Sequence, residues 1–159
     1  MDSPLTLYEG QVQDHWIDEF GHMNMSRYLE VCDFSTYAFW ELVNAPKDLE
    51  ARGGAEYAVV EAHINYLSEL RQGDPLRITT QLLAADKKRF QLFHSLYHGA
   101  TAELVATNEV MALGFDLKGR ALMTFHAPVL ARIDEILAQH RELPKPKNAG
   151  RAIGVRAKG

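Results

Sequence analysis

A cluster of residues that can do acid–base chemistry lies between Trp16 and Asn24. It contains Asp18, Gly21 and His22, and the apolar periodicity that follows predicts that a helix begins here. A helix start presents unpaired backbone N–H groups and partial positive charge, which can polarise a carbonyl or hold an oxyanion. Glycine lets a ligand approach closely, and the carboxylate can act as a base on water or as a nucleophile. On spacing alone, turn and cap roles for Asp18 and Asn24 are equally well supported.

Three polar residues alternate in a later apolar segment: Glu61, His63 and Asn65. Their spacing of two puts them on one face of a predicted strand. Such a row either faces solvent or lines a site, and periodicity alone favours solvent.

Four aromatic residues lie near the first cluster in the sequence: Trp16, Phe20, Tyr37 and Trp40. Core packing is the default interpretation for all four. A quaternary ammonium ligand would prefer aromatic faces and negative potential, and residues 1–60 carry eleven acids against three bases. This pattern gives modest support to a cationic ligand.

The elements that must position these residues follow from periodicity and turn chemistry. A long helix is predicted from Asn24, with Asn24 or Ser26 as its N-cap and a stop signal at Asn44 and Pro46. Strands are predicted at Leu5–Gln13, Tyr57–Leu70, Leu76–Ala85, Arg89–Tyr97, Leu104–Phe115 and Ala121–Phe125. A closing amphipathic helix is predicted at Pro128–His140.

Short turns between long strands indicate antiparallel pairing. The predicted fold class is therefore α+β, with an antiparallel sheet that curls around one long central helix. This domain is expected to occupy residues 1–140. Residues 141–159 carry six bases and one acid and are predicted to form a flexible tail.

Three segments together resemble the hotdog-fold acyl-CoA thioesterases of the 4-hydroxybenzoyl-CoA thioesterase type. They are Asp18–Leu29, which reads D-x-x-G-H-M-N-x-x-x-Y-L, Glu61–Leu67, which reads E-x-H-x-N-Y-L, and Gly73–Asp74. The resemblance covers about residues 5–135. Within that group, Trp16–Asp18 and Phe93–Leu96 look most like the branch that hydrolyses betainyl-CoA in carnitine breakdown.

The resemblance implies a thioester hydrolase in which Asp18 acts as general base or nucleophile. Backbone amides near Gly21 to Asn24 would bind the carbonyl oxygen. The candidate catalytic residues are Asp18, Gly21, His22 and Asn24. The candidate substrate contacts in this region and in the polar strand are Trp16, Phe20, Met23, Glu61, His63 and Asn65. This chain has Met25 where family members usually have asparagine or another residue, which bears on substrate contacts more than on the chemistry.

The family also pairs its subunits so that two sheets become continuous and active sites form between them. A dimer or tetramer is therefore expected. Coenzyme A carries phosphates, so a basic surface is expected as well, and Lys87, Lys88 and Arg89 form one candidate cluster at a predicted hairpin. Solvated turn residues are the simpler interpretation of that cluster.

Composition limits the other possibilities. The 159 residues suggest one domain, and a single cysteine, Cys32, excludes an intramolecular disulfide. The sequence has no apolar run of membrane-spanning length, so a cytoplasmic protein without membrane association is expected. A net charge of -4 argues against nucleic-acid binding. The histidines lack ligand spacing, so neither a metal nor a cofactor other than the CoA of the substrate is expected.

Two alternatives remain open at the level of sequence. An enoyl-CoA hydratase on the same fold would use an aspartate and histidine pair, and His22 is compatible with it. A non-catalytic module would bind acyl-CoA in the same pocket without turnover.

Overall fold

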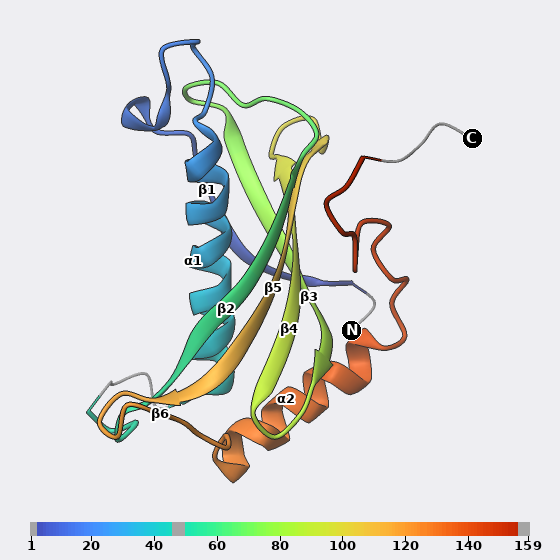
Figure 1. The fold of residues 1–159 in the computed structure, drawn as a ribbon. Coiled ribbons are helices and arrows are strands. Elements are labelled where there is room, and N and C mark those ends of the chain that lie inside the picture. Colours follow the sequence, from blue (N-terminus) through green and yellow to red (C-terminus); the bar gives the residue numbers. More distant parts are fainter. Residues whose placement is uncertain (1–2, 46–49, 156–159) are drawn as a thin grey trace.

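One antiparallel sheet wraps around a long helix in the computed structural model, which describes residues 3–45 and 50–155 (Figure 1). The six strands follow the order β1-β3-β4-β5-β2, with β6 paired to β5. The helices and strands are β1 (Leu5–Gln11), the 3₁₀ turn η1 (Asp14–Trp16), α1 (Met25–Val43), β2 (Ala55–Tyr66), β3 (Pro75–Ala85), β4 (Arg89–His98), β5 (Leu104–Asp116), β6 (Ala121–Leu122) and α2 (Ala127–His140). The predicted α+β hotdog architecture is confirmed.

The central helix α1 begins and ends where its cap residues require. The Asn24 side chain accepts a hydrogen bond from the Ser26 N–H at 2.9 Å, so Asn24 is the N-cap. At the other end the Asn44 side chain donates to the Ala55 carbonyl at 3.0 Å, which joins the end of α1 to the start of β2. The 19 residues between these caps make a rod of about 28 Å.

Three predicted strands end earlier in the structure than the apolar pattern suggested. β2 stops at Tyr66 because Leu67 and Ser68 both donate to the single carbonyl of Val105, which turns the chain out of the ladder. β1 stops at Gln11, two residues short of the prediction, and β6 has only two residues. Beyond β1 and β6, buried residues continue the apolar pattern outside the regular ladder: Val12 and Phe125 donate their N–H groups to the turn carbonyls of Asp74 and Lys87.

The core between α1 and the sheet has two apolar halves. One contains Phe39, Trp40 and Phe90 near the end of α1, and the other contains Trp16 and Met23 near its start. α2 packs Val129, Ile133, Ile136 and Leu137 into the first half. Each half fixes one end of the helix against the sheet.

A buried polar chain also crosses the core. His94 is fully buried, and its two ring nitrogens lie 2.9 Å from the hydroxyls of Thr36 and Thr80. Burial lowers the pKa of His94 to about 3. The ring is therefore neutral at physiological pH and links α1 to β3 and β4.

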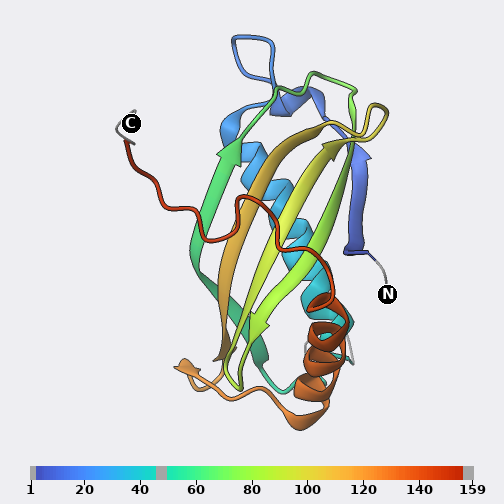
Figure 2. The same cartoon turned by 90° about the vertical axis from the view of Figure 1, so that its right-hand side faces the viewer.

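The residues that follow α2 cross the outer face of the sheet, opposite α1 (Figure 2). The Gly150 N–H donates to the Glu109 carboxylate of β5 at 2.6 Å. Turn bonds from Ala149 to Pro146 and from Arg151 to Asn148 shape this stretch. The flexibility expected of residues 141–159 stays a prediction.

We expect the buried histidine to make the fold sensitive to acid. An unfolded histidine titrates near pH 6.5, so between about pH 6.5 and 3 the unfolded chain binds a proton that folded His94 does not. The free energy of unfolding should therefore fall as the pH falls through this range, by up to about 1.4 kcal/mol per pH unit from this group. Burial also lowers the pKa of His140, which adds to the slope with the same sign. Urea unfolding at several pH values from 7 to 4 measures this free energy. It should fall less steeply with falling pH in His94→Asn than in the wild type, and equal pH dependence in the two proteins would contradict the role of His94.

Candidate active site

The loop before α1 is pinned on both sides by backbone hydrogen bonds. Ile17 and Met23 form an antiparallel bridge, and the Asn24 N–H donates to the Trp16 carbonyl at 2.9 Å. The Met23 N–H donates to Leu70 at 2.8 Å, which ties the loop to the segment after β2. The loop of residues 16–24, which contains Asp18, is therefore held as a closed turn against the first turn of α1.

Asp18 sits at the bend of this turn. Its Oδ1 accepts the N–H of Phe20 at 2.9 Å and, more weakly, that of His22 at 3.5 Å. Among the described residues, Oδ2 has no hydrogen-bond partner. One oxygen therefore shapes the turn, as the turn interpretation predicts, while the other is unpaired, so a catalytic role of Asp18 stays a prediction. Gly21 completes the bend with a φ of +83°, a conformation that glycine adopts without strain.

The backbone N–H groups of residues 21–24 are already paired within the chain. Gly21 donates to the Asp18 carbonyl, and the acceptors of His22, Met23 and Asn24 are those described above. The next N–H along the chain, that of Met25, has no acceptor among the described residues. The one after it, that of Ser26, donates to the Asn24 cap. The structure thus moves the candidate oxyanion donor from residues 21–24 to Met25.

The other predicted residues of the loop differ in exposure. Met23 is buried, and Trp16 is 6% exposed in the same core half, which leaves almost none of the indole for a ligand. The core interpretation of Trp16 is confirmed. Phe20 is 77% exposed at the tip of the loop and packs in no core. His22 lies 3.0 Å from the Glu69 carboxylate through its Nε2.

The charge of Asp18 also affects a neighbouring side chain, Tyr28. The pKa of Tyr28 is raised, first by burial and then by the nearby charges of Glu69 and Asp18. The Tyr28 hydroxyl accepts the Leu70 N–H at 3.0 Å. Asp18, Tyr28 and the segment after β2 therefore form one cluster at the start of α1.

The polar row of β2 lies on the outer face of the sheet in this chain. Glu61 and His63 border a cavity of about 540 Å³ whose other wall is the stretch from Gly150 to Ile153. Asn65 follows on the same face, and its amide nitrogen is buried without a partner among the described residues. The row faces away from the helix start of its own subunit. A substrate role for these three residues stays a prediction.

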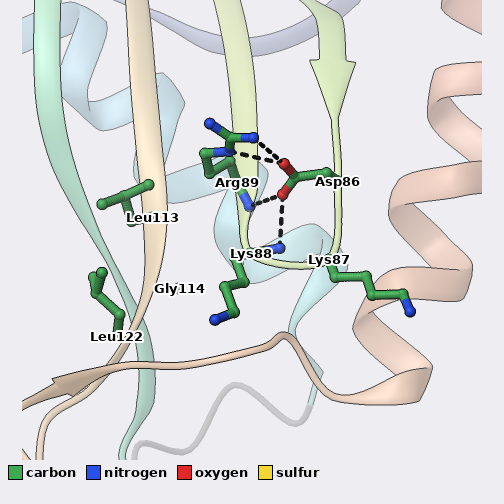
Figure 3. Close-up of a pocket in the computed structure, with 7 residues that line it drawn as sticks. All are labelled: Asp86, Lys87, Lys88, Arg89, Leu113, Gly114 and Leu122. Atoms are coloured by element: carbon green, nitrogen blue, oxygen red, sulfur yellow. Dashed lines mark hydrogen bonds and ion pairs between the residues drawn. The ribbon is translucent and has the colours of Figure 1, made fainter.

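The basic hairpin lies at the far end of the sheet from Asp18. The Asp86 carboxylate accepts the backbone N–H groups of Lys88 and Arg89 at 2.8 Å and pairs with the Arg89 guanidinium (Figure 3). The hydrogen bond from Arg89 is the main reason that the pKa of Asp86 is lowered. The side chains of Lys87 and Lys88 point away from this pair, and a cavity of about 420 Å³ adjoins them.

One feature was missed at the level of sequence. A groove of about 380 Å³ runs between α1 and the strands β2 and β5, beginning at Ser26 beside the helix start. It is bordered by Asp33 and by Asn108, which is 1% exposed. A lone asparagine in an apolar strand was the only signal in the sequence.

The described residues contain neither a cluster of metal ligands nor a membrane-spanning helix. No three of their His, Cys, Asp or Glu side chains gather as metal ligands would. None of the described helices is long and apolar enough to cross a membrane.

Comparison with known proteins identifies the family. A family model of the thioesterase-like superfamily matches residues 12–136. The chain belongs to the thioesterase-like superfamily. The match confirms the family and the thioester hydrolase class expected from the sequence.

Individual relatives of this superfamily member cover nearly the whole chain. The betainyl-CoA thioesterase of Pseudomonas aeruginosa is 34% identical over 155 residues, which are 98% of each protein. The L-carnitine dehydrogenase/betainyl-CoA thioesterase of a Rhizobium species is 35% identical over 95% of this chain, which spans only 30% of that longer protein. A Staphylococcus aureus protein solved in complex with CoA matches with a TM-score of 0.87 and 25% identity over 98% of both chains.

The cap at the start of α1 can be tested in this superfamily member by stability. Asn24→Ala removes the acceptor of the Ser26 N–H and should lower the free energy of unfolding by about 1 kcal/mol. Asn24→Asp keeps an oxygen in that place and should lose much less. Thermal and urea unfolding of the three proteins measure the difference, and equal losses for both variants would show that Asn24 does not act as the cap.

Proposed function

We propose that this chain hydrolyses the thioester of a small acyl-CoA to the free acid and CoA, with betainyl-CoA as the substrate. The single observation that carries the proposal is the pinned turn before α1, in which one oxygen of Asp18 and the N–H of Met25 have no hydrogen-bond partner among the described residues. A carboxylate and an amide donor at a helix start are the groups that acyl transfer requires. The names of the relatives support the substrate.

The residues act on the thioester in complementary ways. The Met25 N–H donates to the carbonyl oxygen as negative charge builds there, and the partial positive charge of the helix start adds to this stabilisation. Asp18 either removes a proton from the attacking water or attacks the carbonyl carbon itself, and water then cleaves the mixed anhydride. In both routes the C–S bond breaks, and CoA leaves as the thiol after protonation. This chemistry needs no metal and no cofactor.

The catalytic role of Asp18 has a near-isosteric test. Asp18→Asn keeps an oxygen to accept the Phe20 N–H but loses the base, so kcat/KM for betainyl-CoA should fall at least about 100-fold. Thiol release is followed with a disulfide dye. Glu19→Gln, a neighbouring exposed carboxylate, is the control and should keep its activity. Activity that survives in Asp18→Asn would overturn the mechanism.

The same assay separates the two alternatives. A hydratase would consume enoyl-CoA without releasing thiol, and a binding module would release none from any acyl-CoA. A panel of betainyl-, short straight-chain and aromatic acyl-CoAs therefore tests the reaction and the acyl preference together.

The working unit that we propose is an oligomer built on a dimer joined through β2. This strand has twelve residues and, within the described part of the chain, pairs only with β5, so its other edge is open. Val59 and Val60 are 41% and 56% exposed on it. A long apolar edge strand in an isolated chain is a ready surface for pairing with a second copy.

Such a dimer would also explain the position of the basic hairpin. Within one subunit, Arg89 pairs opposite Leu113. At the other end of β5, Val105 is bonded by the segment after β2, to which the helix-start loop is tied through Leu70. The two ends are about 27 Å apart at the rise of a strand. Antiparallel pairing of β2 across a two-fold axis would bring the partner's hairpin to the helix-start end. We propose that the partner subunit's Lys87 and Lys88 bind the CoA phosphates there.

Mixing two impaired variants, one in kcat and one in KM, tests the shared site. Subunits of Asp18→Asn and of a Lys87→Ala/Lys88→Ala double variant are mixed and allowed to exchange, with thiol release measured at low betainyl-CoA concentration. A hybrid dimer should contain one site with both defects and one intact site, so about one quarter of all sites regain full activity. The double variant alone should show a raised KM with little change in kcat. If activity after exchange is no more than the average of the two variants, the site does not take these residues from different subunits.

We further propose that the protein works in the cytoplasm and in carnitine breakdown. The lone buried Cys32 fits a reducing compartment. The Rhizobium relative joins, by name, an L-carnitine dehydrogenase to a betainyl-CoA thioesterase.

A further inference from the structure

The segment after α2 forms a strap, residues 144–153, that lies across the outer face of the sheet (Figure 2). The Gln81 amide of β3 donates to the Pro144 carbonyl at 3.5 Å. Farther along, the Glu109 carboxylate of β5 accepts the Gly150 N–H at 2.6 Å. The strap is therefore attached at two strands, and it runs from the β3 side of the sheet toward β2.

The strap also covers an apolar side chain of the sheet. In β4, Phe93 lies between Leu92 and His94, which both point into the core, so Phe93 points to the outer face by alternation. It is paired directly opposite Glu109, the carboxylate that binds Gly150. Phe93 is nevertheless only 2% exposed. The strap crosses this face beside Glu109, so it is the segment that covers the ring (Figure 2).

Beyond its attachment at Gly150 the chain crosses the edge strand of the sheet. The stretch from Gly150 to Ile153 borders a cavity with Glu61 of β2. Farther on, the side chains of Ile153 and Val155 are 91% and 104% exposed. The C-terminal arm, residues 151–155, therefore presents apolar side chains to solvent at the open edge of the sheet. Exposed apolar surface of this kind is typical of a contact with another chain.

The dimer proposed above puts a second outer face directly beyond that edge. Antiparallel strands that pair across a two-fold axis keep their side chains on a common pair of faces, so the outer faces of both subunits are continuous. The arm crosses β2 near its middle, at Glu61. Neighbouring strands are about 4.8 Å apart, so an extended chain that continues past β2 reaches the partner's β2 within about two residues.

The charges of the two surfaces are complementary. Residues 151–159 carry three bases and no acid. Glu61 is exposed on the outer face of β2, and within the described part of the chain neither Glu61 nor Arg151 forms an ion pair. Both side chains border the same cavity without pairing with each other. Each can therefore pair across the junction of two subunits.

We propose that the C-terminal arm of each subunit crosses the junction of the two β2 strands and docks on the outer face of its partner, where Ile153 and Val155 become buried and Arg151 pairs with the partner subunit's Glu61. The occupant of this surface is thus a second copy of the chain. The inference rests on the dimer proposed with the thioesterase function and adds a contact that β2 pairing does not provide. Because the proposed active site is shared between subunits, the arms keep it assembled when the protein is dilute.

Dilution of the full-length dimer tests the contact. Ile153→Ser/Val155→Ser removes apolar surface buried at the junction, so it should raise the dimer dissociation constant at least about tenfold. Lys145→Ser/Lys147→Ser changes two exposed residues of the strap before its attachment at Gly150 and should leave the constant unchanged. Sedimentation velocity over a dilution series measures the constant. The same constant in Ile153→Ser/Val155→Ser as in the wild type would overturn the proposal.

A disulfide cross-link shows on which subunit the arm lies. Cys32 is buried, so an added cysteine is the reactive one. Size-tagged Val155→Cys subunits are mixed with Glu61→Cys subunits and mildly oxidised, and docking across the junction should give a disulfide-linked heterodimer. An arm that folds back on its own subunit would instead form the bond within single chains of the Val155→Cys/Glu61→Cys double variant. That result, without heterodimer in the mixture, would overturn the proposal.

Thiol release distinguishes this proposal from the proposed function. At concentrations above its dissociation constant, Ile153→Ser/Val155→Ser should hydrolyse betainyl-CoA at the wild-type rate, and it should lose activity on dilution where the wild type keeps it. A wild type that stays monomeric at every concentration would overturn the arm contact together with the shared site. Failure of thioester hydrolysis is a different result, namely no thiol release by the wild type or no loss in Asp18→Asn.

Discussion

The packing of α1 into the concave face of a single sheet is the constraint on which the other features depend. A helix of 19 residues can be buried along its length only if the strands curve around it, and the sheet order places β1 and β2 at the two edges. The helix then has one end that is tied into the loop containing Asp18 and another that is joined to β2 through Asn44. Because the helix lies nearer β1, the β2 side is left with an open edge and a groove. The proposed reaction centre lies at the helix start, and the proposed subunit contact uses the open edge of β2.

Polar groups inside this arrangement divide into two kinds. The chain Thr36–His94–Thr80 is satisfied within the protein and holds the helix to two strands as a neutral unit. The buried amide of Asn108 beside it has no hydrogen-bond partner among the described residues. A buried donor or acceptor without a partner costs about 1 to 3 kcal/mol, so such groups persist where a ligand completes them.

Much of the fold followed from local patterns. The helix and its Asn24 cap, the hairpin turns and the closing helix were predictable because periodicity, capping and turn chemistry act over a few residues. Strand ends were less predictable, since Leu70 is as apolar as a strand residue yet is buried through a loop contact with Met23. The candidate base, Asp18, could be predicted from the sequence motif that contains it. The candidate donor, the Met25 N–H, could not be predicted, because it depends on which backbone N–H groups are hydrogen-bonded within the folded loop.

The sequence by itself determined the class of the fold, the family and the candidate loop that contains Asp18, because each depends on patterns among residues close together along the chain. Only the tertiary structure decided which N–H remains free, that Trp16 is a core residue, and that Asp33 and Asn108 face one groove. These two residues are 75 positions apart in the sequence and meet only when β5 is aligned under α1. Their pairing state depends on every neighbour that packing brings near them, and no local pattern contains that information.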